Sequence, residues 1–365
     1  MKLQSWLLHP LALPYLRKIV WANSEESASP LMVLRLVAED GSVGAAEVAV
    51  KPSWYGTTFR SIASALEDIF LPMAMQLDVL DESAFDIAAR RVPEHTSAKG
   101  LVDNALWDLR SAIEQRPLWQ RWGGESRTPL SWLLTRQSPE LMAAEAAEAV
   151  GRYGFKEIKL KGGQGLETDV RAIREVRAAA GRAIRIFVDA NSHYDAGETP
   201  AYLSALAEAG VLAAEDPYAM QPDARFESIQ RAASVPMLVD VSAWSVRDTE
   251  LFCARGARAI ALKPGRSGLS VAWAQSRVAA RSGCRVHVGF AGESAFGTLS
   301  SLQLAASLPG RETWLAAEIS YFVMLREQIV AEPIQIADGS IEMPPVSSCA
   351  ALIDWKRVER LSASV

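Results

Sequence analysis

The first fifty residues show the apolar pattern of β-strands joined by a tight turn. Residues 31–38 are almost entirely apolar, Asp40-Gly41 is a strong hairpin turn signal, and residues 43–48 are again apolar. Nearer the N-terminus, Pro10 and Pro14 interrupt an apolar run. We therefore expect an edge strand at this position and not a signal peptide.

Residues 58 to about 122 change to helical spacing, with apolar side chains that recur every three or four positions. Gly123-Gly124 closes this stretch. Together with the preceding strands, these helices predict a small α+β domain over residues 1–124.

From residue 125 to residue 320, apolar strands alternate with amphipathic helices. Eight candidate strands start near residues 130, 157, 185, 211, 236, 259, 285 and 314, at nearly even steps along the chain. Alternation at this length predicts an α/β fold with a closed eight-stranded barrel. Residues 321–365 contain a second hairpin signal, Asp338-Gly339, and are expected to return to the first domain.

Five charged residues stand where successive barrel strands are expected to end: Lys161, Asp189, Glu215, Asp240 and Lys263. They follow one another at nearly even intervals, as successive βα units would place them. Because barrel enzymes carry their catalytic groups at the carboxyl ends of the strands, we expect these side chains to meet. The three acidic residues fall on neighbouring strands and suit Mg²⁺, with Mn²⁺ as a substitute. The two lysines fall on opposite sides of the ring.

This arrangement predicts removal of a proton next to a carboxylate. A divalent cation stabilises the enolate charge, and a lysine acts as the base once its pKa is lowered. Lys159 lies on the same strand face as Lys161, so it is expected to lower the pKa of Lys161 and to belong to the catalytic set. Asn191 shares a face with Asp189 and is expected to contact substrate or metal-bound water.

Other interpretations remain open at this stage. A single acidic residue at a strand end is often a helix cap, although Lys159 and Lys161 fit an apolar barrel strand poorly. His193 is expected on a loop, and His287 is expected to be a core histidine with satisfied hydrogen bonds. A barrel aldolase with a lysine Schiff base and a non-catalytic relative are the alternatives from other classes.

Composition narrows the class of protein. The net charge is −5 without basic runs, which argues against nucleic-acid binding. No uninterrupted apolar run reaches the ~18 residues of a membrane span. Cys253, Cys284 and Cys349 are too widely spaced for a zinc motif, and their odd number favours a reducing, cytoplasmic location.

Taken together, the motifs resemble those of the enolase superfamily, in the muconate-lactonizing enzyme (muconate cycloisomerase) subgroup. The resemblance covers nearly the whole chain. The matching segments are Lys159-x-Lys161, Asp189 to Asn191, Glu215 to Pro217, Asp240, residues 262–266, the helical segments 98–109 and 117–124, and the loop 289–297 with Glu293.

The resemblance implies a modified TIM barrel, (β/α)7β, with an α+β capping domain, and an even-numbered homo-oligomer. It implies Mg²⁺ on Asp189, Glu215 and Asp240, with Lys161 and Lys263 as acid and base. Small carboxylates are the expected substrates. A lactonizing or lyase reaction like that of muconate cycloisomerase is expected first. Racemisation or epimerisation of N-acylamino acids, or a dehydration like that of o-succinylbenzoate synthase, is the alternative.

Several segments bear on substrate choice. The family's usual motifs are altered at Val241, at Leu269 and at residues 347–349, so the substrate of no single relative carries over. An acidic pair that would hold a dipeptide ammonium is not evident after the eighth strand. Trp54 and Tyr55 are expected to close over an apolar part of the substrate, or else to pack between the domains. Lys51 is expected to meet a second anion, and Glu293 to contact substrate.

Overall fold

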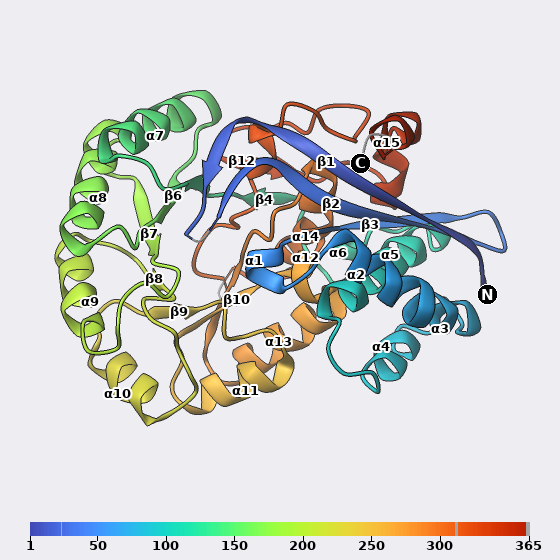
Figure 1. Cartoon of the computed structure of the whole chain (residues 1–365), viewed down its shortest axis with the longest axis horizontal. Helices are drawn as coiled ribbons and strands as arrows, with labels where there is room; N and C mark the ends of the chain where they lie inside the picture. Colours follow the sequence, from blue (N-terminus) through green and yellow to red (C-terminus); the bar gives the residue numbers. More distant parts are fainter. Residues whose placement is uncertain (23, 311–312, 363–365) are drawn as a thin grey trace.

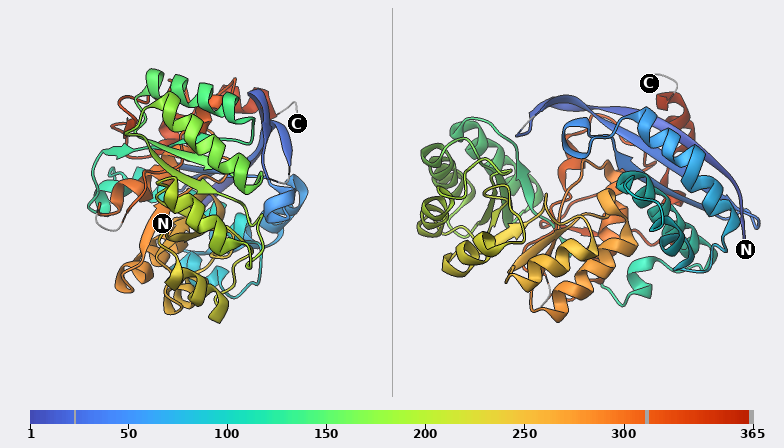
Figure 2. Two further views of the ribbon diagram at one scale, coloured as in Figure 1. Left: turned by 90° about the vertical axis from the view of Figure 1, so that its left-hand side faces the viewer. Right: turned by 60° about the horizontal axis from the view of Figure 1, so that its bottom comes forward.

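Two β-sheets organise the chain, and helices cover the outside of each (Figure 1). The computed structural model describes residues 1–22, 24–310 and 313–362. The first sheet and its helices lie beside a curled parallel sheet. Helices from the central part of the chain surround this second sheet, as the two rotated views also show (Figure 2). No helix in these described ranges has the length and apolar content needed to cross a membrane.

The N-terminal sheet is antiparallel, in the order β1-β2-β3, with strands Leu3–Val20, Glu25–Ala38 and Val43–Ala49. β1 is an edge strand, as its two prolines predict. The turn between β2 and β3 carries Gly41 at φ 85°, which confirms the Asp-Gly hairpin signal. Gly44 lets this sheet approach the helix behind it, because a Cβ there would lie 2.4 Å from the Cβ of Leu109.

Short helices follow this sheet, and the long helix α5 packs on β3. The helices are α1 (Pro52–Tyr55), α2 (Phe59–Ala65), the π-helix η1 (Leu66–Phe70), α3 (Leu71–Gln76), α4 (Ala84–Ala89), α5 (Thr96–Ile113) and α6 (Leu118–Arg121). Buried apolar side chains of α2, η1, α3, α4 and α5 form one cluster with side chains of β2 and β3. The predicted α+β character of this region is therefore confirmed.

The second sheet is parallel and has the order β11-β10-β9-β8-β7-β6-β5. Its strands are β5 (Trp132–Leu134), β6 (Glu157–Lys161), β7 (Arg185–Asp189), β8 (Ala214–Glu215), β9 (Met237–Val239), β10 (Ala259–Leu262) and β11 (Arg285–Val288). Chain order and spatial order agree along the whole sheet, which is the topology expected of the barrel.

The eighth predicted strand is not a regular strand. Two isolated parallel bridges stand in its place, from Thr313 to Val286 at one end of the sheet and from Ala317 to Leu130 at the other. The Glu157 carboxylate accepts a hydrogen bond of 2.7 Å from the backbone N–H of Ala316, the group that a longer ladder would use. The segment thus completes the (β/α)7β ring through single bridges.

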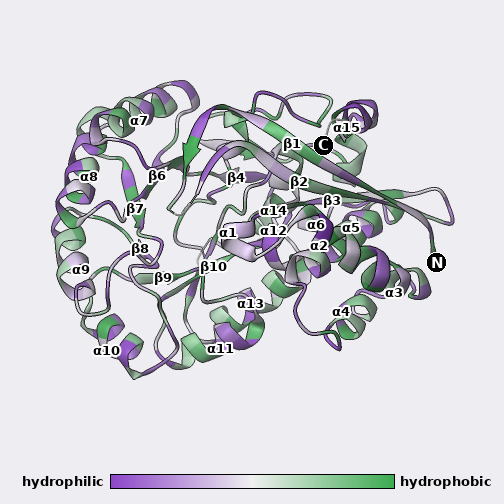
Figure 3. Cartoon of the chain, viewed as in Figure 1, coloured by the Kyte–Doolittle hydropathy of each residue, from purple (hydrophilic) through white to green (hydrophobic). Residues whose placement is uncertain are grey.

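Helices surround this sheet, and several of them show separate polar and apolar faces in Figure 3. They are α7 (Pro139–Tyr153), α8 (Leu166–Ala180), α9 (Thr199–Glu208), α10 (Ala224–Ala232), α11 (Val246–Ala254), α12 (Pro264–Ser267), α13 (Leu269–Arg281) and α14 (Ala295–Ser307). Ser138 caps α7 by accepting a hydrogen bond from Leu141 N.

The C-terminal segment contributes to a third, two-stranded sheet and also packs on the first sheet. β12 (Ser340–Glu342) pairs with β4 (Arg127–Pro129), next to the predicted turn at Asp338-Gly339, whereas α15 (Trp355–Ser362) packs on β1. The 3₁₀-helix η2 (Tyr321–Met324) precedes β12 along the chain, and the 3₁₀-helix η3 (Cys349–Leu352) lies between β12 and α15. The end of the predicted segment, residues 363–365, lies outside the described residues. The domain boundaries at 124 and 320 stay predictions.

Polar side chains of α5 join the N-terminal region to the barrel. Asp103 accepts hydrogen bonds from the backbone N–H and the hydroxyl of Ser270, at 2.8 and 2.6 Å. Asn104 accepts one from Leu269 N at 2.8 Å and donates one to Pro264 O at 2.9 Å. These contacts hold the N-terminal region against α12 and α13, next to the strand ends.

Glu47 makes a second junction, and it predicts a pH effect on stability. Its buried carboxylate accepts hydrogen bonds of 2.6 Å from both the N–H and the hydroxyl of Ser294, the cap of α14. Burial raises the pKa of Glu47 to about 7 from 4.5, so the folded state holds this proton more tightly than the unfolded state. We expect its contribution to the free energy of unfolding to fall between pH 4.5 and 7 by roughly 3 kcal/mol and to stay level above pH 7.

Glu47→Gln tests this effect, because glutamine keeps the shape of the protonated side chain. Urea unfolding of both proteins from pH 4 to pH 8 should give a difference in stability that changes through this window. A constant difference across the window would contradict the assignment to Glu47.

Candidate active site

The three predicted carboxylates lie on adjacent strands and are all buried. Asp189 ends β7, Glu215 ends β8, and Asp240 directly follows β9. Asp189 and Glu215 are direct partners in the parallel ladder. Asp216 fixes the turn beside them, since its carboxylate accepts hydrogen bonds from the N–H groups of Asp240 and Val241 at 3.1 and 2.8 Å.

Each of these carboxylates faces an ammonium group of the predicted lysine set. The Nζ–O distances are 2.5 Å for Lys161–Asp189, 2.8 Å for Lys159–Glu215 and 2.5 Å for Lys263–Asp240. These buried carboxylates are therefore surrounded by buried ammonium groups, which makes their burial tolerable.

The pKa shifts follow from these pairs. Burial alone raises the pKa of Asp189, but Lys161 and Lys159 outweigh it, so the pKa is lowered. Burial lowers the pKa of Lys263, but contact with Asp240 outweighs it and the pKa is raised. The raised pKa keeps Lys263 in its charged form while it pairs with Asp240.

Three further residues complete the charged cluster, and the sequence analysis missed their part in it. Arg266 is buried on Asp240, with Nη1 2.9 Å from its carboxylate. Glu318 lies 2.7 Å from Lys159 Nζ. Glu318 follows Lys263 by the length of two barrel repeats, so the spacing alone could have singled it out. His287 lies beside it and is the third.

His287 is buried in the barrel core as expected, but the expectation of satisfied hydrogen bonds is wrong. Neither ring nitrogen has a hydrogen-bond partner among the described residues, and Nε2 lies 3.8 Å from Glu318. Burial lowers the pKa of His287. The pleat of β11 turns this ring inward, next to Glu318, and Glu318 already pairs with Lys159. His193 follows the end of β7 in a turn, as predicted for a loop.

Two sets of residues are candidates for a divalent cation. Donor atoms of Glu215, His287 and Glu318 lie within 4.8 Å of one another. The Lys159 ammonium already contacts two of these three residues, however. The set of Asp189, Glu215 and Asp240 offers only oxygen ligands, although each of its carboxylates is also paired with an ammonium group. Three carboxylates on neighbouring strands are a donor set of the kind that Mg²⁺ prefers.

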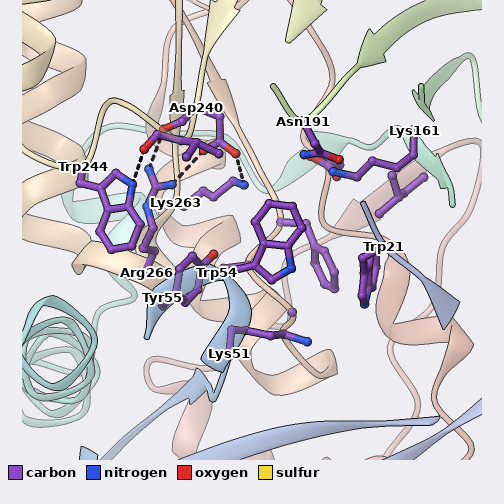
Figure 4. Close-up of a pocket in the computed structure, with 16 residues that line it drawn as sticks. Trp21, Lys51, Trp54, Tyr55, Lys161, Asn191, Asp240, Trp244, Lys263 and Arg266 are labelled. Carbon is purple, nitrogen blue, oxygen red and sulfur yellow. Dashed lines mark hydrogen bonds and ion pairs between the residues drawn. The ribbon is translucent and has the colours of Figure 1, made fainter. Parts of the chain in front are cut away.

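A cavity opens beside this cluster and contains about 620 Å³ of space, its mouth included (Figure 4). It is lined by Trp21, Lys51, Trp54, Tyr55, Leu133, Lys161, Asn191, Asp240, Val241, Trp244, Lys263, Arg266, Phe290, Ala291, Gly292 and Glu318. Trp54 and Tyr55 thus reach the cavity from the N-terminal region, and Tyr55 also packs edge-on against Trp244, with 5.3 Å between ring centroids.

Two predicted contact residues differ in their placement. Asn191 lines the cavity and donates to Asp189 from its N–H at 2.8 Å and from Nδ2 at 3.1 Å. Its Oδ1 is buried without a hydrogen bond. Glu293 is buried behind the cavity wall, where a Cβ on Gly265 would lie 2.3 Å from its Oε1. Its neighbours Ala291 and Gly292 line the cavity instead, and a substrate contact for Glu293 stays a prediction.

Gly289 gives the Lys263 side chain its space, which leads to a further prediction. A Cβ at this position would lie 2.8 Å from Lys263 Cε. Gly289→Ala should therefore displace the ammonium and lower kcat by about 10 to 100-fold, with a much smaller effect on stability.

Gly151→Ala is the matched control, because nothing lies within 4 Å of its Cβ position in α7. Steady-state kinetics and thermal unfolding of both variants check the prediction. Equal kcat values for the two variants would contradict a positional role for Gly289.

Family comparisons agree with this geometry. The pattern described as "Enolase C-terminal domain-like" matches residues 141–347. The pattern described as "Mandelate racemase / muconate lactonizing enzyme, N-terminal domain" matches residues 13–123. The chain belongs to the enolase superfamily. Within the superfamily it falls in the muconate-lactonizing-enzyme-like subgroup, and it is an isomerase or lyase.

Relatives in this superfamily are named for different activities. Muconate cycloisomerase 1 of Rhodococcus opacus is 26% identical, over 92% of this chain and 91% of its own. L-Ala-D/L-Glu epimerase of Bacillus subtilis is 25% identical with the same coverage. The crystal structure of muconate lactonizing enzyme from Mucobacterium Smegmatis complexed with muconolactone has a TM-score of 0.94 at 25% identity, covering 99% of both chains. These similarities support the superfamily reaction and leave the individual substrate open.

Proposed function

We propose that this enzyme transfers a proton at the carbon next to a substrate carboxylate, with Lys161 and Lys263 as acid and base. The observation that carries the proposal is the pairing of these two lysines with separate carboxylates, Asp189 and Asp240, at the wall of one aromatic cavity. β6 and β10 carry them, and three strands of the sheet lie between these two. A substrate in the cavity would therefore have an amine on each side.

Asp189, Glu215 and Asp240 would hold Mg²⁺, which when bound supplies positive charge beside the substrate carboxylate. Lys161 lines the cavity, so as a base it must give up its ion pair with Asp189 and turn its amine to the α-carbon. Lys159 is too buried to reach substrate, and its contacts with Glu215 and Glu318 favour a role in positioning those carboxylates.

Two reaction outcomes fit this arrangement. In a cycloisomerase-like or lyase reaction, as expected first from the sequence, Lys161 moves the α-proton while Lys263 stays protonated and stabilises charge. Racemisation uses both lysines in turn. The nearly equivalent ion pairs of the two lysines favour racemisation as the second candidate.

Proton exchange in D₂O tests the proposal. The Mg²⁺-loaded enzyme is incubated with muconates, N-acylamino acids and aryl-substituted carboxylates, and α-deuteration is followed by NMR. We expect exchange that is lost with EDTA. Deuterium in both enantiomers indicates racemisation, and deuterium with ring closure or elimination indicates a cycloisomerase or lyase. Exchange that persists with EDTA would contradict the proposed role of the carboxylates.

A further inference from the structure

The end of the cavity away from the lysine pair is built on a buried ion pair. Lys51 Nζ lies 2.5 Å from Glu26 Oε2, and the two side chains are only 6% and 15% exposed. The indole N–H of Trp21 donates to the same carboxylate oxygen at 3.0 Å. Lys51 lines the cavity and Glu26 does not. A ligand in the cavity therefore contacts an ammonium group whose positive charge is compensated by Glu26, outside the cavity lining.

This ammonium group is held in place by its surroundings. The stem of Lys51 packs on the loop after β11, where a Cβ on Gly292 would lie 2.8 Å from Lys51 Cε. Ser29 anchors that loop by donating a hydrogen bond of 2.8 Å to Gly292 O. A substrate carboxylate that reached Lys51 would have to displace Glu26 or lie beside it, and like charges in a buried site cost affinity.

Aromatic side chains occupy the space between the two ends of the cavity. Figure 4 shows Trp54 between Lys51 on one side and Lys161 and Lys263 on the other. Trp21, Tyr55, Trp244 and Phe290 also line the cavity. A flat apolar group is the ligand chemistry that such a wall stabilises.

We propose that the cavity selects carboxylates whose far end is an aromatic group bearing an uncharged hydrogen-bond acceptor, to which Lys51 donates. The inference rests on the proposed function, because it takes the reacting carboxylate to lie beside Lys161 and Lys263. It departs from the expectation that Lys51 meets a second anion, and it ranks an aryl-bearing or N-aroyl substrate above an unsaturated dicarboxylate. Glu26 is the residue that determines this specificity.

Binding of matched ligand pairs tests the inference. The pairs are 4-acetylphenylacetate with 4-carboxyphenylacetate, and N-(4-acetylbenzoyl)alanine with N-(4-carboxybenzoyl)alanine, titrated calorimetrically into the Mg²⁺-loaded enzyme. We expect the acetyl member to bind about tenfold more tightly in at least one pair. Glu26→Gln should reduce or reverse this ratio, because Lys51 then carries an uncompensated charge.

Glu25→Gln is the matched control, since Glu25 pairs with the exposed Lys18 on the same hairpin and should leave the ratio unchanged. If Glu26→Gln does not fold, Lys51→Met should weaken binding of the acetyl members by about tenfold, because it removes the proposed donor, and unchanged binding would overturn the inference. The inference is wrong if the acetyl members bind no better in either pair, or if the Glu26 and Glu25 variants give the same ratio.

Proton exchange at the α-carbon, recorded separately for the same compounds, distinguishes this inference from the proposed function. Exchange without the binding preference overturns the inference and leaves the proposed function standing. The opposite result is that the acetyl members bind more tightly but no compound, in these pairs or in the wider panel, exchanges its α-proton. That result supports the inference as a binding property and overturns the proposed function.

Discussion

Lys161→Ala should lower kcat by about 10² to 10⁴-fold, because it removes the amine that the proposed function uses as acid and base at one side of the substrate. Lys161 is partly accessible from the cavity, whereas the neighbouring Lys159 is fully buried, so this loss is assigned to chemistry at the substrate. Steady-state turnover and α-proton exchange of the Mg²⁺-loaded variant measure the effect.

Lys156→Ala is the control for this variant. Lys156 precedes the same strand but is 74% exposed and pairs with Asp338 at the surface, so its loss should leave kcat unchanged. In a racemase, Lys161→Ala should still exchange the proton of one enantiomer through Lys263. Full activity of Lys161→Ala would refute its role as acid and base.

Asp240→Asn should lower the free energy of unfolding by about 3 to 5 kcal/mol, because it leaves two buried cations without their carboxylate. Lys263 and Arg266 contact Asp240 at 2.5 and 2.9 Å, and these two cationic side chains are only 9% and 2% exposed. The same substitution removes one of three proposed cation ligands, so Mg²⁺ affinity should fall as well. Urea unfolding and calorimetric Mg²⁺ titration measure the two effects separately.

Asp338→Asn supplies the comparison for stability. Asp338 also contacts two cations, Arg127 and Lys156, but its side chain is 62% exposed, so the expected loss of stability is much smaller than for Asp240→Asn. Its φ of 49° is one that asparagine tolerates. If Asp240→Asn is no less stable than this control and still binds Mg²⁺ normally, the importance assigned to Asp240 is wrong.

Much of the barrel could be predicted because βα repeats have a narrow range of lengths. Nearly even steps along the sequence place a side chain at the same end of each successive strand, and parallel pairing then brings these ends together. This is why the spacing predicted the proximity of Lys161, Asp189, Glu215, Asp240 and Lys263. The hairpin at Gly41 was predictable for an equally local reason, its positive φ.

Contacts between distant segments were not predictable in this way. The pattern indicated an eighth strand, but Glu157 takes the backbone N–H of Ala316 and leaves only single bridges. The sequence also suggested that Lys51 would present a free charge to a second anion. The hairpin between β1 and β2 brings Glu26 to it across 25 positions and compensates that charge.

The sequence by itself therefore determined the superfamily and the set of charged residues at the strand ends, because both depend on local motifs and on repeat length. Only the tertiary structure decided which charges are paired, and with it the pKa direction of Lys263 and the character of the far end of the cavity. The physical reason is that burial and ion pairing depend on which side chains from other elements occupy the last few ångströms around a group.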